Sequence, residues 1–159
     1  MKWIKHISWI TLMVLPFMLA AQSDEMTKKA AQLCNSGDLI GAERTINEAL
    51  KGDEARTAYA WFVKGFIHKE IYKQIEKQSP VSTNRETAVD AIYRCLELDV
   101  KGTYYDDNLK ALRFLAVTYY NDAVDLINSL SPESTTQPES YFAQFKAIMK
   151  VADPFYDFR

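Results

Sequence analysis

The chain has 159 residues, a length that suits one domain or one short array of repeats. Its hydrophobic fraction of 48% is normal for a globular protein and argues against extensive disorder. Its formal charge of −2 supplies no basic field to neutralise nucleic-acid phosphates, so we expect a folded protein that does not bind nucleic acid.

Residues 1–21 have the features of a signal peptide. Lys2 and Lys5 precede an apolar run from Ile10 to Ala20, which ends in small residues suited to cleavage. The alternative is a membrane anchor, but the uncharged stretch 7–21 is shorter than the ~20 residues that span a bilayer. We expect cleavage before Gln22, leaving an exported protein, periplasmic or secreted, without a stable membrane span.

The rest of the chain, residues 22–159, begins with two predicted helices, 24–36 and 39–51. The turn-forming run Asn35-Ser36-Gly37 ends the first helix, and Asp38 can cap the second. Apolar residues recur at helical spacing in both segments. These residues are Met26, Ala30, Leu33, Ala42, Ile46, Ala49 and Leu50.

A second pair of helices is predicted at 56–78 and 85–98, separated by the turn-forming residues 79–84. Gly65 lies inside the first of these helices, where glycine costs about 1 kcal/mol relative to alanine. A close crossing with another helix explains its use there. We expect Trp61, Gly65 and Ala88 to pack between helices.

A third pair is predicted at 105–130 and 139–152, with Ala116 as a packing residue of the longer helix. Asp153-Pro154 stops the last helix, because proline cannot continue it. We find no run of alternating apolar and polar residues that predicts a strand. The expected fold class is therefore all-α.

The spacing of small and aromatic residues resembles the tetratricopeptide repeat family, whose unit is a helix hairpin. The resemblance implies a solenoid of about three extended repeats, with units of about 23–55, 56–102 and 105–154. The residues that carry it are Ala30, Leu33, Ala42, Ile46 and Ala49, then Trp61, Gly65, Ala88, Ile92 and Cys95, then Leu112, Leu115, Ala116 and Tyr119.

Three stretches, 61–68, 98–102 and 115–121, look like exported repeat proteins of Bacteroidetes-type bacteria, which tend to be longer. The aromatic segment Phe155-Tyr156-Asp157-Phe158 is unlike a polar capping helix. The resemblance therefore suggests a truncated or unusually short member, or a tail that folds back over the last hairpin.

The resemblance also implies a concave face on which a ligand binds. Two alternatives stay open: the aromatic residues of this set line a groove, or they bury against one another, and its charged residues contact a ligand or lie on a solvated face. The candidate residues are Tyr59, Phe62, Phe66, Lys69, Lys110, Arg113, Tyr120 and Asn121.

Catalytic and metal sites are not predicted. Beyond the signal peptide the chain has one histidine, His68, which excludes a histidine-rich zinc site, and we expect it to pack within its hairpin. Cys34 and Cys95 lie in different units, and burial as free thiols is favoured over a disulfide. No phosphate-binding glycine motif occurs, so we expect no cofactor.

These observations favour a non-catalytic scaffold of the cell envelope that binds a protein or peptide. The alternative is a structural subunit that assembles with copies of itself, which the aromatic segment 155–158 motivates. An enzyme of unrecognised type is the third hypothesis.

Overall fold

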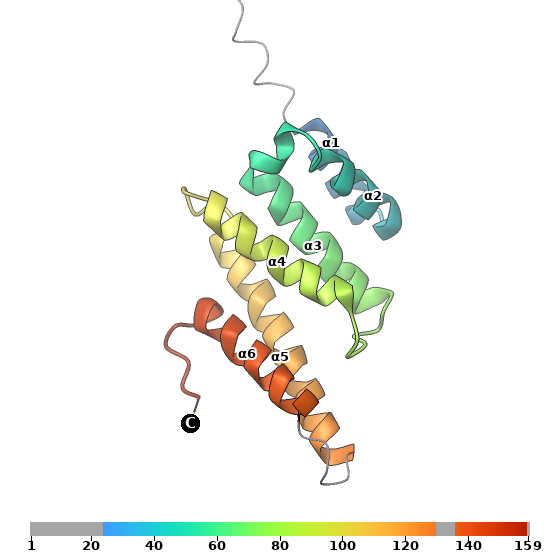
Figure 1. Ribbon diagram of the computed structural model, residues 1–159. Helices are drawn as coiled ribbons and strands as arrows, with labels where there is room; N and C mark the ends of the chain where they lie inside the picture. The colour runs from blue at the N-terminus through green and yellow to red at the C-terminus, as the bar shows by residue number, and fades with distance from the viewer. Residues whose placement is uncertain (1–23, 130–135, 159) are drawn as a thin grey trace, which may run out of the picture.

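The computed structural model describes residues 24–129 and 136–158, which form six α-helices, one short 3-10 helix and no strand. The elements are α1 (Glu25–Asn35), α2 (Leu39–Ala49), η1 (Asp53–Arg56), α3 (Ala58–Gln74), α4 (Thr83–Leu98), α5 (Tyr105–Ser129) and α6 (Thr136–Ala152) (Figure 1). The predicted all-α class is confirmed, and the predicted signal peptide lies outside the described residues. None of the described helices has both the length and the apolar character needed to cross a lipid bilayer.

Side-chain caps and backbone geometry set the helix ends. Asp38 accepts a hydrogen bond from the Gly41 amide at 2.9 Å, which confirms the predicted cap of α2. Ser82 caps α4 in the same way, through the amide of Arg85. Helix α3 ends at Gln74, earlier than predicted, because Lys77 and Gln78 take left-handed φ values of 52° and 59°.

The helices pack as three successive hairpins, α1 with α2, α3 with α4 and α5 with α6 (Figure 1). Neighbouring hairpins meet where α2 contacts α3 and where α4 contacts α5. Two buried clusters fill the interior, one among α1, α2 and α3, the other among α3, α4, α5 and α6. The direct contact between α3 and α5 is small, and α4 contacts both of these helices.

The crossing of α3 and α4 depends on Gly65. A β-carbon at this position would lie 2.9 Å from Cγ1 of Ile92 and 3.5 Å from the carbonyl oxygen of Ala88. Ala88 itself is fully buried, as is Ala116 on α5. The predicted close crossing is present, and its closest contact is with a β-branched side chain that has little rotational freedom.

A buried arginine joins the second and third hairpins. Arg85, at the start of α4, is 1% exposed and lies 2.5 Å from the carboxylate of Asp122 on α5. Its second terminal nitrogen donates to the carbonyl of Pro80 at 2.7 Å, and Tyr141 on α6 donates to the same carbonyl at 3.1 Å. The guanidinium carbon also lies within 3.7–5.5 Å of the ring centroids of Tyr119, Tyr72 and Tyr141.

The first hairpin is tied to the chain that follows it through η1. The N-cap residue of α1, Asp24, makes no side-chain capping bond. Instead, the buried carboxylate of Glu54 accepts hydrogen bonds from the Thr27 amide at 2.8 Å and the Thr27 hydroxyl at 2.5 Å. The indole of Trp61 donates to the carbonyl of Ala55 at 2.7 Å, so η1 is bonded to both α1 and α3.

Gly65→Ala is expected to lower the free energy of unfolding by about 1 kcal/mol, because the steric cost of about 1–3 kcal/mol exceeds the gain in helix propensity of about 1 kcal/mol. Urea denaturation followed by circular dichroism measures the change. In an Ile92→Ala background the same substitution should be stabilising, because the atom at 2.9 Å is gone. Equal effects in both backgrounds would show that Ile92 is not the obstacle.

Asp122→Ala is expected to cost about 3 kcal/mol, because it leaves the guanidinium of Arg85 buried without its partner charge. Glu97→Ala is the matched control, since it breaks the exposed 2.6 Å pair between Arg94 and Glu97 and should change stability by less than about 0.5 kcal/mol. Thermal unfolding of the two variants compares them. Similar losses would mean that the buried pair contributes no more than a surface pair.

Candidate functional site

Helices α3 and α5 form the walls of a groove of about 440 Å³, a size typical of ligand pockets. Its apolar lining comes from aromatic and aliphatic side chains of both walls and of α4 behind them. The lining residues that the site uses are Phe62, Phe66, Ile92, Ala111 and Phe114, with Lys69, Lys73, Asp107, Asn108 and Lys110 as the polar ones.

A smaller hollow of about 200 Å³ adjoins this groove between α1 and α3. Phe62 and Phe66 line both spaces, so the apolar surface is continuous from α1 across α3 to α5. The hollow is also lined by Cys34 and Asn35 at the end of α1. We call the two spaces together the α1–α3–α5 groove.

The aromatic residues of α3 divide between stacking and exposure. Phe62 stacks on Tyr104, the residue before α5, with ring centroids 4.6 Å apart, and Tyr59 stacks on the same ring at 6.1 Å. Phe66 is 41% exposed. The sequence left open whether these aromatic residues line a groove or bury against one another. Both occur: Tyr59 and Phe62 are half-buried within the wall, whereas Phe66 presents its ring to the groove.

Three lysines stand along the groove beside fewer acids. Lys69 lies 3.0 Å from Glu70 and 4.3 Å from the ring centroid of Phe66, and Lys110 pairs with Asp107 at 3.1 Å. Lys73 is 3.6 Å from Glu70. Asp107 lines the larger space with these lysines, and Glu70 pairs with two of them, so three positive charges face two negative ones here and the excess is one charge.

The buried carboxylate of Glu70 holds two of these lysines in place. Burial by itself raises its pKa, but a 2.6 Å hydrogen bond from Gln74 and the charges of Lys69 and Lys73 outweigh burial and leave the pKa below its ordinary value. Glu70 is therefore ionised at neutral pH and orients Lys69 over the ring of Phe66.

Five of the eight predicted site residues meet in the α1–α3–α5 groove, and three do not. Tyr59, Phe62, Phe66, Lys69 and Lys110 line it. Arg113 and Asn121 are exposed on α5 outside its lining, and Tyr120 instead packs on Phe142 and Phe145 of α6, at 5.6 Å and 5.3 Å. On α5 the groove is lined by Lys110, as predicted, and by Ala111 and Phe114, rather than by Arg113, Tyr120 and Asn121.

Sequence reasoning missed Lys73, Phe114 and Tyr104. Lys73 and Phe114 follow Lys69 and Lys110 by one helical turn, so the i to i+4 spacing on each helix could have found them. Tyr104 precedes α5 in an irregular segment, where no periodicity applies. Its place against α3 follows from the carboxylate of Asp99, which accepts from the Tyr104 amide at 2.6 Å.

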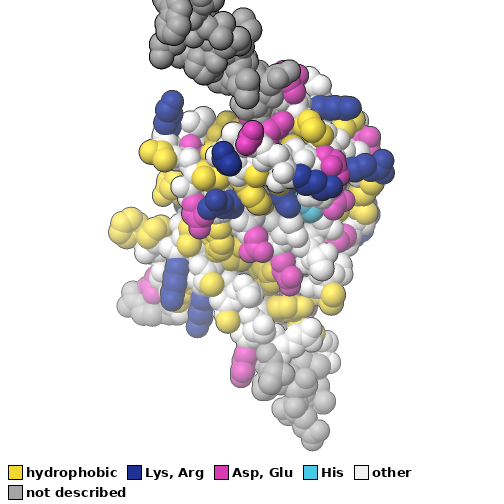
Figure 2. Space-filling view, turned by 45° about the horizontal axis from the view of Figure 1, so that its top comes forward, with side chains coloured by type: hydrophobic (Ala, Val, Ile, Leu, Met, Phe, Trp, Pro, Cys, Tyr) yellow, Lys and Arg dark blue, Asp and Glu magenta, His cyan; other side chains and the backbone are white. Residues whose placement is uncertain are grey.

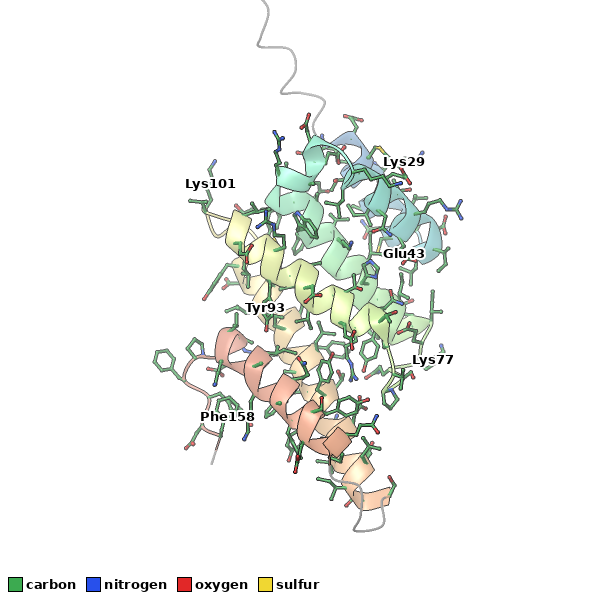
Figure 3. The ribbon with its side chains drawn as sticks, viewed as in Figure 1. Lys29, Glu43, Lys77, Tyr93, Lys101 and Phe158 are labelled. Atoms are coloured by element: carbon green, nitrogen blue, oxygen red, sulfur yellow. The ribbon has the colours of Figure 1, made fainter. Side chains whose placement is uncertain are left out.

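A third hollow, of about 640 Å³, is lined by α6, by Tyr120 of α5 and by the segment after α6. Tyr156 and Phe158 pack edge-on against Phe145, with centroids 5.9 Å and 6.1 Å away. Figure 3 shows Phe158 on this segment beside α6. The segment folds back over the last hairpin, while Phe155 remains 95% exposed.

His68 packs between α3 and α4, as predicted, and is 4% exposed. Its Nδ1 lies 2.6 Å from Oδ1 of Asn84, whose amide nitrogen in turn donates to Glu76 at 2.7 Å. Nδ1 is therefore the protonated nitrogen, and Nε2 has no hydrogen-bond partner among the described residues. Because burial lowers its pKa, this arrangement holds a neutral imidazole in place at neutral pH.

The cysteines are buried, and the acids form no metal-binding cluster in the described part of the chain. Cys34 and Cys95 are both buried and free, as predicted, and burial raises the pKa of each thiol. Among residues 24–129 and 136–158, no group of three or more His, Cys, Asp or Glu side chains is placed to hold a metal ion.

The protein is expected to lose stability as pH falls from about 7.5 to about 5.5, because burial lowers the pKa of His68 from 6.5 and the unfolded chain binds the proton first. The hydrogen bond to Asn84 and the charges of Glu43 and Glu76 oppose this lowering, and Lys64 adds to it. The contribution is complete above pH 6.5 and disappears as pH drops through the folded-state pKa. Urea midpoints at the two pH values should differ less for His68→Gln than for the wild type; an equal pH dependence would contradict this assignment.

Comparison of the chain with protein-family models, with curated proteins and with solved structures found no match. The groove and its charges therefore carry the functional argument on their own.

Proposed function

We propose that this protein is a non-catalytic binding module, a short solenoid of three tetratricopeptide-like hairpins that holds a peptide or protein segment in the α1–α3–α5 groove. The observation that carries the proposal is the continuous apolar lining shared by two adjoining hollows, with lysines beside it. Aromatic anchors in a groove supply binding energy, and charged groups at the rim select the partner.

The stacking of the hairpins supports the solenoid interpretation. Small buried residues lie in the first two hairpins, such as Ala30, Ala42 and Ala88, and successive hairpins contact each other through α2 with α3 and α4 with α5. In such an array the first helices of the hairpins line one face, which here are α1, α3 and α5. That face holds the groove.

The lysines of the groove favour an acidic ligand segment, and its apolar lining favours an aromatic or large apolar one. The rings of Phe62, Phe66 and Phe114 offer apolar contact, while Lys73 and Lys110 are half or more exposed at their side chains. Figure 2 shows one face of the molecule, on which hydrophobic side chains lie among charges of both signs. We place this binding in the cell envelope, on the strength of the signal-peptide pattern in residues 1–21.

Selection of a displayed random-peptide library against the purified protein tests the proposal. Selected peptides should be enriched in aromatic residues flanked by Asp or Glu. Phe66→Ala combined with Lys110→Ala should weaken their binding by about tenfold or more in isothermal titration calorimetry, because truncating a central aromatic anchor costs more than about 1 kcal/mol.

Ile40→Ala combined with Lys28→Ala is the matched control, because both residues are exposed and lie outside the groove lining. This variant should bind the selected peptides as the wild type does. Peptides that bind the groove variant and the wild type equally well would rule out this face as the binding site.

A further inference from the structure

The segment after α6 has the composition that the α1–α3–α5 groove accepts. It reads Asp153-Pro154-Phe155-Tyr156-Asp157-Phe158, with three aromatic rings and two carboxylates in six residues. Helix α6 ends at Ala152, and the residues that follow are irregular. The segment is therefore a short peptide of acidic and aromatic character displayed on the surface of the protein itself.

The contacts of this segment divide its aromatic residues into two classes. Tyr156 and Phe158 pack on each other at 5.0 Å and both lie against Phe145 of α6. Phe155 is 95% exposed, so nearly its whole ring is in water. Because its neighbours are anchored, Phe155 is presented in a fixed place, which lowers the entropic cost of burying it against a partner.

Charge complementarity connects the segment to the groove. Lys69, Lys73 and Lys110 line the larger space against the two carboxylates of Asp107 and Glu70, and Lys73 and Lys110 keep half or more of their side chains exposed. Phe155 follows Asp153 by two residues. Asp157 interacts within its own protomer, so the match relies on Phe155 and Asp153. A phenyl ring between Phe66 and Phe114, with a carboxylate near a lysine, satisfies both features of the groove.

We propose that the groove of one protomer binds the segment 153–158 of a second copy of this chain, with Phe155 as the anchor. This inference rests on the proposed function, since it names the partner of the same groove. The contact is head-to-tail: each protomer offers a groove and a segment, and the two are different surfaces. Copies linked in this way extend into chains unless the rotation between them closes a ring.

Sedimentation velocity from micromolar to near-millimolar concentration tests this proposal. The wild type should form species beyond the monomer as its concentration rises, and salt should weaken the association. Phe155→Ala should stay monomeric over the same range, and so should Phe66→Ala. Val100→Ala is the matched control, because Val100 is 94% exposed and lies outside the groove, and it should associate as the wild type does.

Mixing the two monomeric variants gives the decisive measurement. The Phe155→Ala chain keeps an intact groove and the Phe66→Ala chain keeps an intact segment, so an equimolar mixture should form heterodimers and nothing larger. A mixture that stays monomeric overturns the proposal, as does a wild type that is monomeric at near-millimolar concentration or a Phe155→Ala chain that still associates.

The outcomes also separate this inference from the proposed function. If displayed peptides bind the groove of a strictly monomeric wild type, the binding module stands and its partner is a different protein. If the wild type associates through Phe155 but Phe66→Ala associates equally well, the segment docks elsewhere and this inference fails. If no peptide binds and no association occurs, both proposals fail.

Discussion

The buried ion pair between Arg85 and Asp122 is the interaction on which the rest of the structure depends. It is formed by α4 and α5, which belong to different hairpins, and it also reaches Tyr72 on α3, 3.3 Å from the guanidinium. Buried charges contribute little net stability when paired, but a wrong pairing leaves an unpaired charge in the interior. The pair therefore selects one register of the third hairpin against the second.

This register determines the width of the groove. Helices α3 and α5 have little direct contact, so their separation is fixed by α4, which packs on both. The contacts of Arg85 lie near the end of α3 and the start of α4, away from Phe62 and Phe66. They join α3, α4 and α5 at that end of the groove. Toward the other end of α3 the walls are bridged by Tyr104 stacking on Phe62, and the apolar lining between these two points is left open.

Local signals in the sequence predicted the helices, because capping, turn-forming and small packing residues mark them along the chain. Asp38 and Gly37 mark the turn of the first hairpin, and Gly65 and Ala88 mark the seam of the second. The same helical spacing placed Phe62, Phe66 and Lys69 on one face of α3, since residues one turn apart on a helix stay together whatever the tertiary fold. The grouping of Lys110 with them came from the resemblance to the repeat family.

The features that sequence reasoning missed depend on pairing between distant elements. Nothing near Arg85 indicates that its guanidinium is buried, because its partner, Asp122, belongs to the next hairpin. The rotation of α5 also depends on α6: Tyr120 turns toward Phe142 and Phe145, and this rotation brings Phe114 into the groove and takes Arg113 out of it. A family pattern fixes which residues share a helix face but not how a lengthened helix is rotated by its neighbours.

The bond between Glu54 and Thr27 has a consequence for the order in which the chain folds. The amino-terminal end of α1 is closed by a carboxylate that lies beyond α2, so α1 lacks its acceptor until η1 has been synthesised and has docked. A chain that emerges from the ribosome residue by residue therefore completes α1 late, when the first hairpin and η1 close together as one cooperative unit.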